Sequence, residues 1–307
     1  MIERKMSHKR SRITGFIRSV GVSTVAVLAV ACFSLPEETE GAPVRETIFA
    51  VTGGMSLIKF NAGQPRRILD GKPVTGLAAG DRLIGIDFRV ARGVLYALSA
   101  SGRLYTLDTA SGALKPVGAA PAALPFTGSM FGVDFNPAAD RIRVVSDSGF
   151  NLRLHPDTGA AVDGNAALDG LQPDAALTFA AGDELAGKQP ALIAAAYTYN
   201  KKDEKITTNY AIERTTGSLV VQGSIEGASP VVSPNAGILR TVGSLGVSGV
   251  TDAGFDIADV SGAAYAVLRT ASDTRSRLHL IDLSTGRARA VGTVGDGAPL
   301  LGMAIEP

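Results

Sequence analysis

A short turn between two apolar segments recurs five times and sets the period of the chain. It reads Asn-Ala-Gly at 61–63, Ser-Gly at 111–112, and Thr-Gly at 158–159, 216–217 and 285–286. Successive turn glycines lie 49, 47, 58 and 69 residues apart. A period of this length is typical of architectures in which similar units stack on one another, because a single unit cannot bury its own faces.

Each unit consists of short apolar segments separated by Gly, Ser, Asp and Asn. In the first complete unit and the one after it, these segments lie at 83–89, 94–98, 104–108 and 116–118, and at 131–137, 141–146 and 151–156. Apolar runs of this length with such turns are typical of strands joined by hairpins. Four-stranded units that repeat around a ring form a β-propeller.

The two ends of the chain complement each other. Residues 301–307 match the first segment of a unit with nothing after it, whereas 48–51 and 57–60 match the second and third segments with no first. One blade is therefore shared between the termini, which closes the ring and removes its open edges. We predict an all-β, five-bladed β-propeller whose first blade is closed by the C-terminal strand.

The fourth unit follows the pattern least well. Its first segment is placed at 176–179, and an insertion rich in Gly, Ser and Pro spans 217–243. This insertion is either a hairpin on the fourth blade or part of a sixth blade, so six blades are the alternative.

Residues 1–31 have the composition of a secretory signal peptide. Six Lys or Arg and one Glu lie within 1–18, and an uncharged apolar run of 17 residues follows at 19–35. An uncleaved membrane anchor ranks second, because a spanning helix needs roughly 20 apolar residues. We assign 1–31 to the signal peptide, 32–46 to a linker and 47–307 to a single propeller domain.

Cys32 is the only cysteine of the chain. The segment Leu-Ala-Val-Ala-Cys at 28–32 resembles a bacterial lipobox, with Ala in place of the favoured Leu three positions before the cysteine. Two outcomes stay open: lipidation of Cys32 as the first mature residue, or ordinary cleavage after Ala-x-Ala that leaves an inert thiol. In both cases no internal disulfide can form.

Charge restricts the class of partner. Without residues 1–31 the chain holds 24 Lys and Arg against 28 Asp and Glu, a net charge of −4. A mildly acidic domain lacks the basic surface that binds nucleic acid. We expect an exported monomer that is periplasmic, an outer-membrane lipoprotein or secreted, and that binds an envelope protein or a small ligand. Its membrane attachment would be limited to a lipid on Cys32.

Several stretches resemble a bacterial family of exported proteins, the domain of unknown function 4394. They are LIGIDFR at 83–89, LYAL at 95–98, GRLYT at 102–106 and FGVDFNPAADRIRVVSD at 131–147, and the likeness continues through 151–156 and 195–198. It covers roughly residues 47–306. The resemblance implies an exported, propeller-like protein and supplies no activity, substrate or catalytic residue.

One hairpin of the second complete unit concentrates polar side chains. Strand alternation places Arg141 and Arg143 on one face of the first strand, and Asn151, Arg153 and His155 on one face of the second. Guanidinium groups beside an amide suit an anionic ligand, so these five residues are the predicted ligand-binding set. The alternative, which we favour because both faces of a blade are covered, is a set of Arg–Asp pairs that fixes blade packing.

Asp87, Asp134 and Asp256 occupy the same place in the first strands of their units. First strands line the channel of a propeller, so the three carboxylates form a predicted partial ring for a cation, with Ca²⁺ the expected ion in an exported protein. The ring is incomplete, since Thr178 and Ala304 are placed at the other positions. As an alternative, each Asp accepts backbone N–H groups or pairs with an Arg.

Few residues suit catalysis. After residue 31 the histidines are His155 and His279, in different units, and no Gly-x-Ser-x-Gly elbow is present. Turn formation accounts for an acidic tract, namely Asp157, Asp163, Asn165, Asp169 and Asp174. We therefore favour a binding or scaffolding module of the cell envelope over an enzyme. The rival is a metal-dependent hydrolase or lactonase-like enzyme with its site at the channel mouth.

Overall fold

The computed structural model describes residues 40–307, and the structural statements below concern these residues. The predicted signal peptide, Cys32 and the first part of the predicted linker lie outside them. Regular structure consists of strands and two single-turn 3-10 helices, η1 (Val90–Arg92) and η2 (Pro234–Ala236). Within this part of the chain, no helix has the length and apolar character needed to cross a membrane.

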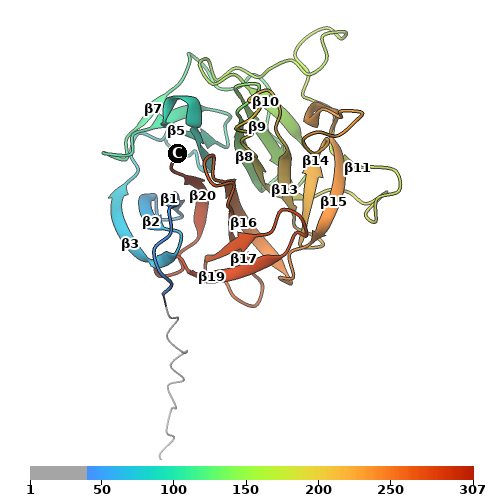
Figure 1. Ribbon diagram of the computed structural model, residues 1–307. Helices are drawn as coiled ribbons and strands as arrows, with labels where there is room; N and C mark the ends of the chain where they lie inside the picture. Colours follow the sequence, from blue (N-terminus) through green and yellow to red (C-terminus); the bar gives the residue numbers. More distant parts are fainter. Residues whose placement is uncertain (1–39) are drawn as a thin grey trace, which may run out of the picture. The chain divides into compact units, whose positions relative to one another are not determined.

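Twenty strands form five sheets around a central axis (Figure 1). From the axis outward, blade 1 contains β20 (Leu300–Ile305), β1 (Thr47–Thr52), β2 (Ser56–Asn61) and β3 (Gln64–Pro73), and blade 2 contains β4 (Leu83–Arg89), β5 (Val94–Ser99), β6 (Leu104–Leu107) and β7 (Leu114–Pro116). Blade 3 contains β8 (Phe131–Asn136), β9 (Arg141–Ser146) and β10 (Asn151–Leu154). Blade 4 contains β12 (Leu192–Tyr197), β13 (Asn209–Glu213), β14 (Ser218–Gln222), β15 (Ile238–Ser244) and β11 (Thr178–Phe179), and blade 5 contains β16 (Val250–Ile257), β17 (Ala264–Thr270), β18 (Arg277–Ile281) and β19 (Ala288–Thr293). The predicted five-bladed propeller is confirmed.

The C-terminal strand closes the ring as predicted. β20 pairs antiparallel with β1, with Ile305 opposite Ile48 and Ala304 opposite Phe49. Beyond the strand, Glu306 forms an ion pair of 2.8 Å with Lys59 of β2. The first and last segments of the propeller therefore belong to one sheet, and neither is left as an open edge.

The five inner strands form a closed ring, in which β4 contacts β20 and β8, β12 contacts β8 and β16, and β16 contacts β20. Glycine permits this close approach. A Cβ atom on Gly302 would lie 2.8 Å from the backbone nitrogen of Ile86, and one on Gly132 would lie 2.6 Å from the carbonyl carbon of Ala194. Small residues near the axis are thus a steric requirement of the ring.

The hydrophobic core is divided among the junctions between blades. Five clusters of buried apolar side chains occur, each formed by neighbouring blades. Two of them include aromatic pairs in edge-to-face geometry: Phe49 with Phe88 between blades 1 and 2, at 5.8 Å between ring centres, and Tyr96 with Phe135 between blades 2 and 3, at 5.2 Å. Stability therefore depends on each blade covering the next.

The fourth blade differs from its sequence prediction. Its inner strand is β12, whereas the predicted first segment at 176–179 contains β11, which pairs in parallel with β15 at the outer edge. The prediction was wrong because β12 (LIAAAY) is a continuous apolar run without the Gly-x-Asp sequence of β4, β8 and β16. The insertion at 217–243 supplies β14 and part of β15, so it belongs to the fourth blade and no sixth blade forms.

The described end of the predicted linker lies along the turn at 61–63. The Asn61 side chain accepts the N–H of Val44 at 2.9 Å and donates to its carbonyl at 2.7 Å. Gly63 is required here, because a Cβ atom on it would lie 2.1 Å from the carbonyl oxygen of Ala42. Residues 41–46 are thus mostly exposed yet hydrogen-bonded to blade 1.

Candidate functional site

The three repeat aspartates converge on the central axis. Asp87, Asp134 and Asp256 are buried, and each offers a carboxylate oxygen, the three oxygens lying within 4.8 Å of one another. They come from β4, β8 and β16, where each stands two residues after the inner-strand glycine. Equivalent positions in a ring face the same axis, so the repeat itself brings these side chains together.

Each of these carboxylates joins its own blade to the following one. The Oδ2 atoms accept backbone N–H groups of the next inner strand: Asp87 from Phe135 at 2.7 Å, Asp134 from Tyr197 at 2.8 Å and Asp256 from Ile305 at 2.6 Å. At the other two junctions the equivalent residues are Ala196 and Ala304. The placement of Thr178 in this ring was wrong, because Thr178 lies in the outermost strand of blade 4.

Protonation limits the charge of this three-aspartate cluster. Loss of hydration on burial raises the pKa of Asp87 to about 7. Burial, followed by repulsion from Asp87, also raises the pKa values of Asp134 and Asp256 well above their usual range. Three adjacent buried negative charges repel one another, so the cluster keeps protons near neutral pH.

The same cluster supplies part of the donor set of a cation. Ca²⁺ takes six to eight oxygen ligands at about 2.3–2.6 Å. Of the six carboxylate oxygens in the cluster, five already accept backbone N–H groups. The structure thus brings the predicted metal ligands together. The same oxygens accept backbone N–H groups that join neighbouring strands, and metal binding stays a prediction.

Arg143 lies at the centre of a second polar cluster, between blades 3 and 4. It is the largest fully buried side chain, with 1% of its surface exposed. Its guanidinium donates to Tyr197 Oη (3.1 Å), Asn151 Oδ1 (2.7 Å), Asp174 Oδ2 (2.6 Å) and Asn235 Oδ1 (2.6 Å). Because these acceptors come from both blades and from two connecting segments, Arg143 ties the junction together.

Arg153 shares one carboxylate with Arg143. The two residues lie opposite each other on β10 and β9, and Arg153 Nε donates to Asp174 Oδ2 at 2.8 Å. The Asp174 side chain has no exposed surface. Asp174 was ascribed to turn formation in the sequence, since its partners lie 21 and 31 residues away and no local pattern marks them.

The remaining residues of the predicted ligand-binding set lie outside this network. His155 Nδ1 accepts the N–H of Asp157 at 3.2 Å within a turn, and Arg141 donates to the carbonyl of Asp140 at 2.8 Å. The structure therefore brings Arg143, Asn151 and Arg153 together in a buried network, and separates Arg141 and His155 from them.

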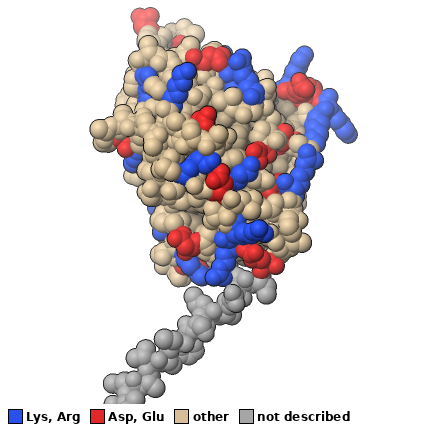
Figure 2. Space-filling model, turned by 90° about the vertical axis from the view of Figure 1, so that its left-hand side faces the viewer, with Lys and Arg blue, Asp and Glu red and all other residues tan. Residues whose placement is uncertain are grey.

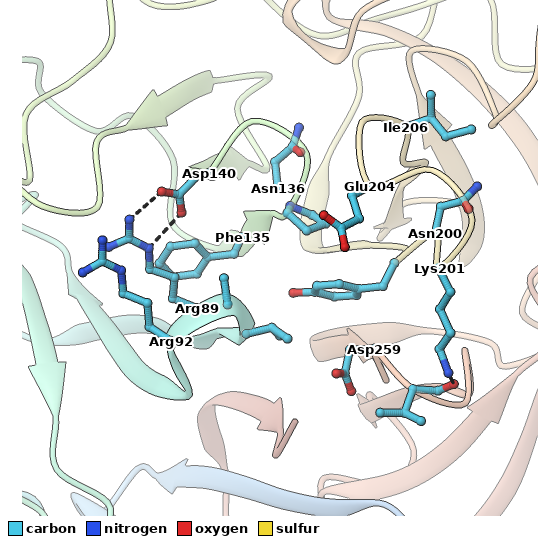
Figure 3. Close-up of a pocket in the computed structure, with 15 residues that line it drawn as sticks. Arg89, Arg92, Phe135, Asn136, Asp140, Asn200, Lys201, Glu204, Ile206 and Asp259 are labelled. Atoms are coloured by element: carbon cyan, nitrogen blue, oxygen red, sulfur yellow. Dashed lines mark hydrogen bonds and ion pairs between the residues drawn. The ribbon is translucent and has the colours of Figure 1, made fainter.

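A cleft of about 560 Å³ lies at one mouth of the channel (Figure 3). It is lined by the loops that follow the inner strands of blades 2 to 5. In each of these four strands, one position is equivalent to that of the axial aspartates. The residue three positions after it lines the cleft in every case: Val90, Pro137, Tyr199 and Asp259. This cleft was not predicted from the sequence, although counting three residues onward from the aspartate position of each inner strand identifies these four residues.

Part of the cleft wall is fixed by internal contacts. Arg89, which is 4% exposed, donates from Nε to Asp140 Oδ1 at 2.8 Å, as the dashed lines in Figure 3 show. Further internal contacts are those of Arg89 with Asp157, Asn200 with Glu226, and Lys201 with the carbonyl of Val260. These side chains form the framework of the cleft.

Four other lining side chains have polar ends that form neither a hydrogen bond nor an ion pair with any residue in 40–307: Arg92, Tyr199, Glu204 and Asp259. Burial and then the charges of Asp87, Asp134, Asp256 and Asp259 raise the pKa of Tyr199. Its hydroxyl therefore stays protonated and can donate a hydrogen bond. The cleft thus combines a rigid frame with unpaired polar groups from three blades.

The channel itself is narrow beyond the aspartate cluster. The space between the inner strands measures about 30 Å³ and is lined mainly by Gly, Ala and apolar residues, among them Gly85, Gly132, Gly254 and Gly302. This volume holds about one or two water molecules. A ligand that enters the cleft therefore meets a closed floor.

Comparison with known proteins identifies the family. The family described as Domain of unknown function (DUF4394) matches residues 56–304. No curated protein matches the chain. Among solved structures, the chain is similar to a structural genomics protein of unknown function from Bacteroides thetaiotaomicron VPI-5482, with 17% identity and a TM-score of 0.46 over 84% of this chain and 63% of that one. It is also similar to the glutaminyl cyclase of Myxococcus xanthus, with 11% identity and a TM-score of 0.44 over 83% of this chain and 97% of that one. Because the family match spans most of the chain, the protein belongs to the DUF4394 family.

Proposed function

We propose that this propeller is a binding module of the cell envelope that takes a small ligand in the cleft at the channel mouth. The observation that carries the proposal is the convergence of Arg92, Tyr199, Glu204 and Asp259 on one cleft, with no partner for their polar ends in the described chain. A volume of about 560 Å³ falls within the range of small-molecule sites.

The composition of the cleft suits binding. Its lining combines apolar side chains with a few amide and charged groups that can fix the orientation of a ligand. The predicted Arg141–His155 site supports the proposal less well, because Arg143, its central residue, is enclosed by protein acceptors.

A thermal-shift screen of the purified protein against small amines, carboxylates, zwitterions and sugars tests the proposal. A ligand of the cleft should raise Tm, since binding to the folded state alone stabilises it. The shift should be lost in Tyr199→Phe and kept in Tyr105→Phe, a control in blade 2 outside the cleft. Shifts that survive every substitution in the cleft would contradict the proposal.

A second candidate function rests on the geometry of Asp87, Asp134 and Asp256. Convergent carboxylates suit a cation, and a cation at this depth would support a metal-dependent hydrolase or lactonase-like activity. Metal analysis, combined with melting in EDTA and in Ca²⁺, separates the two candidates. The binding proposal expects no stoichiometric ion and no change in Tm, whereas a bound ion whose removal lowers Tm favours the second candidate.

We also propose that the protein is exported by the segment 1–31 and acts as a monomer. The composition of this segment supports the first part, and the charge distribution agrees with an envelope role rather than nucleic-acid binding. On the described face shown in Figure 2, basic and acidic side chains lie beside one another.

If Cys32 carries a lipid, Cys32→Ser should move the protein from the membrane fraction to the soluble fraction. Unchanged fractionation would contradict lipidation.

A further inference from the structure

The unpaired charges of the cleft are separated by sign. Arg92 lies on the left of Figure 3 beside Arg89, whereas Glu204 and Asp259 lie to the right. Arg92 belongs to η1 in blade 2, Glu204 to the loop between β12 and β13, and Asp259 to the loop after β16. Lys201 also lies on the right, and its ammonium group donates to the carbonyl of Val260. A ligand that spans the cleft therefore meets the free guanidinium of Arg92 on one side and, on the other, two free carboxylates beside a lysine that is already hydrogen-bonded.

Apolar side chains also line the cleft. Val90, Phe135, Pro137, Ile206 and Val260 contribute to the lining. Apolar side chains of a ligand would lose exposed surface against them, at about 25 cal/mol per Å² buried. The Tyr199 hydroxyl adds a neutral donor within this surface.

We propose that the cleft binds a small zwitterion of the amino-acid or dipeptide type, with its carboxylate toward Arg92 and its ammonium group toward Asp259. This inference rests on the proposed function, since it names the ligand class of the same cleft. Arg92 supplies a planar donor that matches a carboxylate. Asp259 and Glu204 supply acceptors for an ammonium group. A compound that lacks either charge leaves one end of the cleft unpaired.

The test is calorimetric titration of the purified full chain with alanyl-leucine and two capped forms. N-acetyl-alanyl-leucine lacks the ammonium group, and alanyl-leucine amide lacks the carboxylate. The free dipeptide should bind at least about tenfold more tightly than either capped form, because each end contributes a charge-assisted hydrogen bond.

Two variants assign the ends of the ligand. Arg92→Gln should remove the preference for the free carboxylate, and Asp259→Asn should remove the preference for the free ammonium group. Neither residue has a partner in the described chain, so both variants should fold normally. Lys115→Gln and Glu184→Gln, which change exposed charges outside the cleft, are the matched controls and should bind like the parent.

Three outcomes would overturn the inference. If all three compounds bind equally, the cleft does not select a zwitterion, although it still binds ligands as proposed. If none binds at millimolar concentration while another class in the thermal-shift screen does, the ligand class is wrong and the proposed function stands. If the dipeptide binds unchanged to both variants, the site lies elsewhere and both proposals fail for this cleft.

Discussion

Two polar clusters of this propeller contain the same kinds of residue and use them differently. Around Arg143, at the junction of blades 3 and 4, the guanidinium donates to four protein acceptors and Asp174 is shared with Arg153. In the cleft at the channel mouth, Arg92 and Asp259 have no partner in the described chain. The first cluster holds blades together, and the second is available to a ligand.

The difference follows from burial. A buried charge without a partner costs several kcal/mol, so the Arg143 junction is stable only when its donors and acceptors are matched within the protein. A charge at the rim of a cleft is solvated and can stay unpaired at little cost until a ligand arrives. Residue type alone therefore does not separate a structural arginine from a binding one.

Asp174→Ala should produce the largest loss of stability. It removes the carboxylate shared by Arg143 and Arg153 and leaves Arg143 charged and buried, which costs about 3–5 kcal/mol of unfolding free energy. Glu204→Ala is the matched carboxylate deletion in the cleft and should change stability by less than about 0.5 kcal/mol. Urea unfolding measures both, and equal losses would remove the distinction between the two clusters.

Asp134→Ala should have an intermediate effect. It leaves the N–H of Tyr197 without its acceptor, which costs about 1–3 kcal/mol of unfolding free energy. Asp134→Asn keeps an oxygen acceptor and removes a charge from the cluster, so it should be at least as stable as the parent at pH 7. A loss of stability in both variants would show that the negative charge itself is needed, as it would be for a bound cation.

Protonation of the aspartate cluster predicts a further effect, a dependence of stability on pH. The pKa of Asp87 is raised from 3.8 to about 7 in the folded protein. Its contribution to the stability of the fold is therefore fully present below pH 3.8, and this stability is lost as the pH rises toward 7. Buried His279 acts in the opposite direction, because its lowered pKa costs stability as the pH falls.

Comparison of the parent with Asp134→Asn cancels the His279 contribution, since both proteins contain it. Tm of Asp134→Asn minus Tm of the parent should increase from pH 5 to pH 7.5 by a few degrees, about 2–4 °C per kcal/mol for a domain of this size. A difference that stays constant across this range would contradict the shared-proton description of the cluster.

The repeat made the ring predictable from the sequence. The spacing of the turns and the complementary ends of the chain indicate a closed ring of five blades. The Gly-x-Asp position of three inner strands places Asp87, Asp134 and Asp256 at the axis. The fourth blade was misplaced because LIAAAY in β12 fulfils the steric requirement with alanine instead of glycine and carries no aspartate. A strand defined by small side chains alone gives no motif to recognise.

The partners of each site could not be read from the sequence. Arg143 contacts Asn235, 92 residues away, and Asp174, 31 residues away, across a junction that only the folded ring creates. Arg92, Glu204 and Asp259 come from loops of three blades and share no local pattern, since loop residues are free to differ between repeats. The sequence therefore predicts where polar residues lie along each strand, and the ring decides which of them meet.

The most direct test of this account is the unfolding free energy of Arg143→Gln and Arg92→Gln, measured side by side by urea denaturation. The two variants make the same chemical change in the two clusters. Arg143→Gln should cost about 3 kcal/mol or more, because it breaks the buried network with Asp174, whereas Arg92→Gln should fall within about 0.5 kcal/mol of the parent. Equal losses, or a larger loss in Arg92→Gln, would contradict the division between a cluster that holds the blades and a cluster that receives a ligand.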